Sequence, residues 1–226
     1  AGLPGLPRTA WLEIDLDALS ANLATLRAGV PAGVRVEPAV KADAYGHGAV
    51  PIAVALEAAG ADGLCVATFD EAVELRDAGV RLPVLVLFPV PPGWAAEAAR
   101  RRIALTVGDP SLLERTLAVV REIAARGRPL RPALRLQVEV ETGLGRGGLP
   151  PAAVAPAAAA IGATRGARLT GIWSHLAAAE DRARSRLQAE RFAEVERLLA
   201  GDGLSVPPRH LAASGGLLAG SAAPLD

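Results

Sequence analysis

Short apolar runs alternate with longer amphipathic stretches along the chain, a pattern typical of βα units around a parallel sheet. An opening segment over residues 11–15 leads into the first helical stretch. The apolar runs predict seven strands, over residues 35–40, 63–67, 83–87, 103–107, 134–140, 169–173 and 210–213. The amphipathic stretches predict helices over residues 17–28, 49–59, 69–78, 93–101, 111–126, 151–161 and 181–199.

Seven strands, each trailed by a helix, predict an α/β fold in the form of a TIM-type (β/α)8 barrel that lacks its eighth strand. A doubly wound open sheet fits the pattern almost as well, and the local pattern does not distinguish the two. No shift in composition and no linker divides the chain. We therefore expect one barrel domain over residues 11–226, preceded by an N-terminal extension over residues 1–10.

The composition, with 51% hydrophobic and 21% charged residues, is that of a soluble globular protein and excludes a disordered chain. The 24 basic and 24 acidic residues cancel, which disfavours nucleic acid or an anionic membrane surface as a partner. No apolar run reaches the roughly 18 residues of a membrane span, and the N-terminus lacks the layout of a signal peptide. These features predict a cytoplasmic protein.

One feature of the composition bears on chemistry. Lys41 is the only lysine among the 24 basic residues, and Tyr45 is the only tyrosine. Only an amine forms an imine with an aldehyde, so an arginine cannot replace a lysine that has this role. Composition alone leaves open whether this lysine is kept for chemistry or by chance.

The densest polar cluster, residues 40–48, follows an apolar strand and precedes a helix, and active sites of α/β barrels lie at such strand ends. A plain polar turn would account for its glycines but not for a lysine there. The segment Ala39-Val40-Lys41-Ala42-Asp43-Ala44-Tyr45-Gly46-His47-Gly48 resembles the motif of bacterial alanine racemases, the fold-type III pyridoxal-phosphate enzymes. The similarity extends from Trp11-Leu12-Glu13-Ile14-Asp15 to His210-Leu211-Ala212-Ala213-Ser214.

The resemblance implies an enzyme that interconverts L- and D-alanine, and so supplies D-alanine for peptidoglycan. In the family, the motif lysine holds pyridoxal 5'-phosphate as an internal aldimine and is one of two catalytic bases, a role that falls here to Lys41. The family tyrosine at Tyr45 lies near the cofactor phosphate. The cofactor spreads the carbanion at the α-carbon into its ring, and a neutral lysine collects the proton.

A second segment, residues 139–148, contains Gly143-x-Gly145-x-x-Gly148, which matches a dinucleotide-binding fingerprint but lacks an acidic residue about 20 positions later. It also resembles the family run that ends in an arginine, which implies that Arg146 contacts the cofactor's phenolic oxygen and the substrate carboxylate. Seven residues earlier, many members have a carbamylated lysine that orients this arginine. Glu139 stands there, and we expect its carboxylate within about 6 Å of Arg146. A solvent-facing glutamate at a strand edge is the alternative.

Two later segments complete the predicted cofactor site. His175 follows the strand Gly171-Ile172-Trp173, and the resemblance implies that it packs against the cofactor ring; otherwise it is a satisfied core histidine. Ser214, in Ala213-Ser214-Gly215-Gly216, stands where the family has Asn-Ser and implies a phosphate contact. The three histidines lie far apart and show no metal-ligand spacing, so we expect no metal.

The length separates two hypotheses. The family continues into an eighth strand and a C-terminal β domain that carries the second base, a tyrosine, and its members are homodimers. We therefore expect these 226 residues to be an incomplete racemase that acts on a small amino acid, alanine. The alternative is a non-catalytic pyridoxal-phosphate carrier of the same barrel fold.

Overall fold

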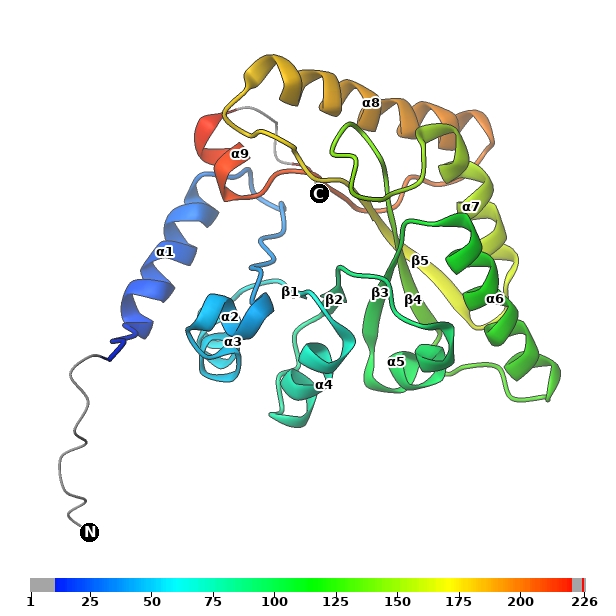
Figure 1. The fold of residues 1–226 in the computed structure, drawn as a ribbon, viewed down its shortest axis with the longest axis horizontal. Coiled ribbons are helices and arrows are strands. Elements are labelled where there is room, and N and C mark those ends of the chain that lie inside the picture. Colours follow the sequence, from blue (N-terminus) through cyan, green and yellow to red (C-terminus); the bar gives the residue numbers. More distant parts are fainter. Residues whose placement is uncertain (1–10, 221–224, 226) are drawn as a thin grey trace, which may run out of the picture.

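In the computed structural model, which describes residues 11–220 and 225, six parallel strands form one curved sheet with helices around its outside (Figure 1). The strands are β1 (Leu64–Val66), β2 (Val84–Val86), β3 (Ile103–Val107), β4 (Leu134–Glu139), β5 (Ala167–Trp173) and β6 (Arg209–His210). The strands lie in the sheet in the same order as in the chain. A doubly wound sheet would reverse its order at a switch point, so that alternative is wrong and the architecture is a half-barrel.

The seven predicted helical ranges all contain helices close to the expected bounds. The helices are α1 (Leu16–Ala28), α2 (Lys41–Gly46), α3 (Ala49–Ala58), α4 (Phe69–Asp77), η1 (Pro92–Trp94), α5 (Ala95–Arg101), α6 (Pro110–Ala125), α7 (Pro151–Ala163), α8 (Arg182–Gly201) and α9 (Ser214–Ala219). Of these, α2 and α9 fall outside the predicted ranges. Local signals set several starts: the Asp109 carboxylate accepts a 2.7 Å hydrogen bond from the Leu112 N–H at the start of α6, next to Pro110. In the described residues, no helix is both long and apolar enough to cross a membrane.

The predicted strand over residues 35–40 is wrong as a regular strand, since only an isolated bridge joins Ala39 to Cys65 of β1. Two residues of this segment have no backbone N–H available for pairing with β1. Pro38 has no N–H, and the N–H of Val36 donates instead to the Asp62 carboxylate at 2.7 Å. The segment still runs beside β1, because the Val40 N–H donates to the Cys65 carbonyl at 2.8 Å.

At the other edge, the predicted strand over residues 210–213 is shortened to the two residues of β6. Among the described strands β6 pairs with β5 alone, through Ile172–Arg209 and Trp173–His210. The chain then turns at Ala213 into α9. The predicted extension over residues 1–10 lies outside the described residues.

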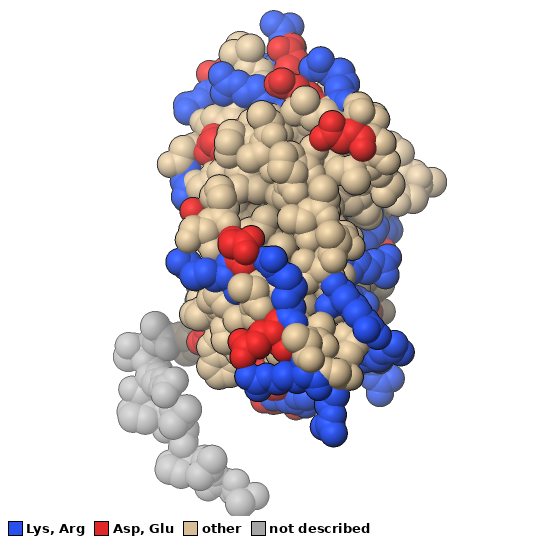
Figure 2. All heavy atoms as spheres, turned by 90° about the vertical axis from the view of Figure 1, so that its right-hand side faces the viewer, with Lys and Arg blue, Asp and Glu red and all other residues tan. Residues whose placement is uncertain are grey.

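The core has two parts. Most buried side chains lie in one cluster that includes the apolar faces of the helices, and residues Cys65, Leu85, Ala104 and Trp173 form a second, smaller cluster. Figure 2 views the side on which α6 and α7 lie: charged side chains gather toward both ends, with a broad uncharged area between them. α7 itself has no charged residue. The longest strands, β3, β4 and β5, lie next to one another in the sheet, and the loops at the carboxyl ends of β4 and β5 carry predicted site residues.

Candidate active site

The side chains predicted to carry chemistry lie at the carboxyl-terminal edge of the sheet. Glu139 ends β4, Arg146 lies in the loop that follows, and His175 lies two residues after β5. Lys41 follows the segment bridged to β1, and Ser214 begins α9. The pKa of His175 is lowered, first by burial and then by the positive charges of Arg146 and Lys41. Both Arg146 and Lys41 are therefore within electrostatic reach of His175.

The lysine-bearing turn, α2, has an unusual backbone. Residues 42–45 all have positive φ, between 51° and 58°, and form a left-handed turn. Gly46 and Gly48 have positive φ as well, as expected for glycines in a turn. Left-handed geometry costs a non-glycine residue about 1–2 kcal/mol. The turn that carries Lys41 is thus strained, and strain of this kind persists only where neighbouring groups hold it.

Glu71 is the first of these groups. One carboxylate oxygen, Oε1, accepts the Ala42 N–H at 2.7 Å, directly after Lys41. The other, Oε2, accepts the N–H groups of Ala67 at 2.7 Å and Thr68 at 3.1 Å. The same carboxylate thus caps α4 and ties the lysine turn to the loop after β1. The Thr68-x-x-Glu71 capping box is visible in the sequence, but its contact with Ala42 is not.

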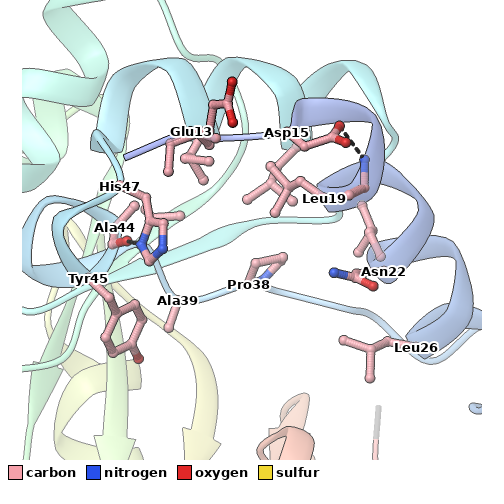
Figure 3. Close-up of a pocket in the computed structure, with 16 residues that line it drawn as sticks. Glu13, Asp15, Leu19, Asn22, Leu26, Pro38, Ala39, Ala44, Tyr45 and His47 are labelled. Atoms are coloured by element: carbon pink, nitrogen blue, oxygen red, sulfur yellow. Dashed lines mark hydrogen bonds between the residues drawn. The ribbon is translucent and has the colours of Figure 1, made fainter. Parts of the chain in front are cut away.

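Two further hydrogen bonds close the turn from inside. The Asp43 carboxylate accepts the N–H of Ala49 at 2.6 Å, where α3 begins. The His47 ring nitrogen Nδ1 lies 2.8 Å from the carbonyl oxygen of Ala44 and donates to it, as Figure 3 shows. These contacts fix Asp43 and His47 as parts of the scaffold around Lys41.

Arg146 and Glu139 pair as expected. Guanidinium Nη2 lies 3.8 Å from carboxylate Oε1, and the Glu139 side chain is only 13% exposed, so the solvent-facing alternative is wrong. Burial raises the pKa of Glu139; Arg146 counteracts this shift and Glu141 adds to it. Gly108 leaves room for the carboxylate, because a Cβ there would lie 3.1 Å from Glu139 Oε2.

The glycine-rich loop after β4 does not have the geometry of a dinucleotide site. The Glu141 carboxylate accepts the N–H groups of both Gly143 and Gly145, the latter at 2.8 Å. A pyrophosphate would need those N–H groups and a helix opening directly behind them. Here α7 begins only at Pro151. The dinucleotide alternative therefore finds no support in this loop.

Tyr45 and Ser214 line the same cavity, of about 410 Å³, between residues 34–39 and 209–214. The cavity thus lies between the two outer edges of the half-barrel. Tyr45 is 61% exposed and Ser214 is exposed too, so both residues are open to solvent. The structure brings these two predicted residues together at one opening.

A second cavity of about 410 Å³ separates α1 from the lysine turn (Figure 3). Leu19, Asn22 and Leu26 line it from α1, and Tyr45 and His47 face them from the turn. Its lining is mainly apolar, whereas the cavity that Tyr45 shares with Ser214 is bordered by more polar groups. Tyr45 is the residue of the turn that borders both.

The concave side of the sheet holds polar groups that the sequence did not reveal. The Trp173 ring stacks on His210 with centroids 5.8 Å apart, and His210 Nε2 hydrogen-bonds to Gln137 Oε1 at 3.0 Å. Burial lowers the pKa of His210 to about 4, so this histidine is neutral at pH 7. The buried Thr106 hydroxyl and Trp173 indole N–H have no hydrogen-bond partner among the described residues.

Gln188, on the buried face of α8, is a second residue that sequence reasoning missed. It contacts the loops after β4 and β5, which carry Arg146 and His175. The signal is weak but present: a glutamine interrupts the buried stripe of α8 formed by Ser185, Phe192, Val195 and Leu199. A polar residue on a core-facing stripe needs buried partners.

Comparison with known proteins gives concordant matches. Residues 14–226 match the family model described as alanine racemase, N-terminal domain. Alanine racemase of Syntrophobacter fumaroxidans is 38% identical over 211 residues, covering 92% of this chain and 54% of that protein. Alanine racemase of Thermobifida fusca is 40% identical over 215 residues, with 92% and 55% covered. This chain spans about half the length of the curated relatives it matches.

Solved structures agree with this similarity. The crystal structure of alanine racemase from the D-cycloserine-producing Streptomyces lavendulae matches with a TM-score of 0.82 and 36% sequence identity. The match covers 94% of this chain and 55% of that one. The half-barrel and its strand-end loops are thus similar to part of that enzyme.

Proposed function

This chain belongs to the family of alanine racemase N-terminal domains, and on that premise we propose that it is the cofactor-binding part of an amino-acid racemase. The enzyme would be an isomerase that interconverts L-alanine and D-alanine with pyridoxal 5'-phosphate. The observation that carries the proposal is the position of Lys41, the only lysine, on a strained turn within electrostatic reach of the half-buried His175, on which Arg146 also acts.

The donor groups of this site fit that cofactor. Lys41 offers the amine that an aldehyde requires. The Tyr45 and Ser214 hydroxyls, which share one cavity, suit a phosphate, and the His175 ring suits packing against the pyridine. We assign cofactor binding to these four residues together with Arg146. When bound, the cofactor supplies an electron sink that makes the α-proton of an amino acid removable.

The protein side of the reaction follows from charge and position. With the cofactor bound, the amine of Lys41 would be the base that accepts the α-proton on the face of the substrate that it approaches. Arg146 binds the substrate carboxylate through two guanidinium N–H groups and so fixes which face is presented. Glu139, already paired with Arg146, holds the guanidinium in the orientation that the family obtains from a carbamylated lysine.

Racemisation also needs a proton donor on the opposite face of the α-carbon. Tyr45 is part of the same turn as Lys41, so we do not assign it this role. We propose that a tyrosine of a C-terminal β domain supplies the proton, that an eighth strand closes the TIM-type barrel between residues 34–39 and β6, and that the enzyme is a homodimer. Residues 11–226 would then form one barrel domain behind a short extension, residues 1–10.

The setting of the reaction is part of the same proposal. A soluble, cytoplasmic racemase would supply D-alanine for peptidoglycan, with no nucleic-acid or membrane partner and no metal. The similarity to proteins named alanine racemase, at 38% and 40% identity, favours catalysis over the alternative of a non-catalytic cofactor carrier.

The test combines cofactor loading with turnover. Purified protein incubated with pyridoxal phosphate should absorb visible light, and borohydride should fix the cofactor on the peptide that contains Lys41. In a coupled D-alanine assay, the 226-residue chain should show no measurable turnover, whereas a chain extended to the natural stop codon should be active. Protein that stays colourless would contradict cofactor binding, and equal activity in both chains would contradict the assignment of the second base.

A further inference from the structure

We propose that Gln188 is a positioning residue that holds the loop carrying Arg146 in register with the loop carrying His175. This role for the site rests on the proposed function, although the contacts themselves do not. Gln188 lies on α8, outside the strand-end loops, and its side chain is among the largest fully buried ones, at 2% exposure.

The Gln188 amide uses both of its N–H donors and one of the two lone pairs on its carbonyl oxygen. Its Nε2 donates to the hydroxyl oxygen of Thr142 at 3.0 Å and to the carbonyl oxygen of His175 at 3.0 Å. Its Oε1 accepts the N–H of Ala177 at 2.8 Å. Thr142 belongs to the loop after β4, and His175 and Ala177 to the loop after β5. One buried side chain therefore joins the two loops.

The direction of the hydrogen bonds beyond Gln188 is also fixed. The Ser174 hydroxyl donates to the Val140 carbonyl at 2.7 Å, and it lies 2.8 Å from the Thr142 hydroxyl. A hydroxyl has one proton, so Thr142 must donate to Ser174 and must itself accept from Gln188. The chain of donors therefore begins at an N–H of Gln188, which a carboxylate at this position cannot supply.

This arrangement bears directly on the proposed site residues. Gln188 binds the carbonyl of His175 itself, and Thr142 lies four residues before Arg146 in the same short loop. Arg191, one turn later on α8, adds a 2.8 Å hydrogen bond to the Thr142 carbonyl. Side chains of α8 therefore join the two loops that carry Arg146 and His175, and we expect both groups to shift when the amide is lost.

Two variants separate this role from ordinary packing. Gln188→Glu keeps the size and the acceptor for Ala177 but, when ionised, removes both donors. Gln188→Met keeps the approximate volume and leaves the buried polar groups of Thr142, His175 and Ala177 short of a partner. The matched control is Glu194→Gln, on the exposed face of the same helix.

The first measurement is hydrogen exchange on the cofactor-free 226-residue chain. Both Gln188 variants should raise amide exchange about tenfold in two separate segments, residues 142–148 and 174–177, with no change in the control. Faster exchange in only one segment, or in neither, would overturn the proposal. This measurement does not depend on cofactor binding.

The second measurement is the dissociation constant of pyridoxal phosphate as a function of pH, followed by visible absorbance. We expect about tenfold weaker binding in both variants at pH 8. For Gln188→Glu, the ratio to the parent should fall toward 1 as the pH decreases, because a protonated carboxyl regains one donor and burial raises the pKa of such a group. For Gln188→Met the ratio should stay constant.

The two measurements distinguish the two proposals. If the parent chain binds no cofactor, the proposed function fails, while the exchange data still decide the contact between the loops. If the parent binds cofactor and Gln188→Glu behaves as the parent does at pH 8, the proposed function stands and Gln188 is not a positioning residue.

Discussion

The two halves of the candidate site are held by opposite means. The lysine turn has a strained left-handed backbone, and two carboxylates, of Glu71 and Asp43, hold it by accepting backbone N–H groups. The loops with Arg146 and His175 are held by the buried, neutral Gln188 amide and a directed chain of hydroxyls. An ionised carboxylate only accepts hydrogen bonds, so each of its partners has to be a donor. A side-chain amide both donates and accepts, so each of its partners must have the matching role. The first half therefore depends on charge and the second on hydrogen-bond direction.

The largest effect should come from the lysine itself. Lys41→Ala removes the amine, and Lys41→Arg keeps the positive charge but cannot form an imine, so neither variant should bind the cofactor covalently. We expect no borohydride label and, in the full-length enzyme, a loss of turnover of at least about 1,000-fold, or about 4 kcal/mol. Covalent labelling of Lys41→Arg would show that the amine is not the attachment point.

Charge dependence in the first half can be tested at Glu71. Glu71→Ala removes the acceptor of three backbone N–H groups, and we expect a loss of about 2 kcal/mol in the free energy of unfolding, measured with urea. Amide exchange at Ala42 should rise while the loops next to Gln188 are unaffected. Glu74→Ala, exposed on the same helix, is the control and should cost less than about 0.5 kcal/mol. Equal losses in both variants would mean that Glu71 acts only as a helix residue.

Glu139→Gln tests whether the anion next to Arg146 serves function at the expense of stability. Without a full negative charge, the guanidinium is less firmly oriented, and we expect the KM for alanine of the full-length enzyme to rise about tenfold, or about 1.4 kcal/mol. Cofactor affinity should change much less. An unchanged KM would remove the role we assign to Glu139.

The stability of the same variant should depend on pH. The pKa of Glu139 in the fold lies above its ordinary value of 4.5, so its ionised form is disfavoured there. The folded state favours the protonated carboxyl, so the contribution of this group to the free energy of unfolding is complete below pH 4.5. That contribution is lost as the pH rises through the raised pKa. The free energy of unfolding of Glu139→Gln should therefore match that of the parent at low pH, and it should exceed that of the parent at pH values above the raised pKa. Urea unfolding at several pH values measures this difference, and a constant difference would contradict the raised pKa.

Helices were easier to predict than strands because their signals are local. The Asp109 cap and the Thr68-x-x-Glu71 box lie within a few residues of the helices they start. The strand predicted over residues 35–40 is interrupted because the Val36 N–H donates to the carboxylate of Asp62, which lies 26 residues later in the sequence, and not to a neighbouring strand. No local pattern reports such a hydrogen bond.

In the candidate site, too, some features could be predicted from the sequence and others depend on long-range contacts. The pairing of Glu139 with Arg146 was expected because Glu139 stands where the resembling family has a carbamylated lysine, and the 3.8 Å separation confirms the pairing. The left-handed turn was not predicted, because alanines at positions 42 and 44 give no sign of positive φ. The role of Gln188 depends on how α8 packs over two loops, 46 residues from Thr142 and 11 from Ala177. Roles carried over from the family for Lys41, Tyr45, Arg146, His175 and Ser214 stay predictions.

The smallest expected effect isolates the strain of the lysine turn. Ala42 is exposed and has φ of 51°, so Ala42→Gly relieves about 1–2 kcal/mol of left-handed strain, against about 0.5–1 kcal/mol of added freedom in the unfolded chain. The variant should be more stable by about 0.5–1 kcal/mol. Ala193→Gly, exposed within α8, makes the same chemical change where the backbone is helical and should destabilise by about 1 kcal/mol. Urea unfolding of the two variants should thus give opposite signs. If both variants lower the free energy of unfolding by the same amount, the turn is not under strain. The two halves of the site would then differ only in the hydrogen bonds that hold them, those of two carboxylates in one half and of the Gln188 amide in the other.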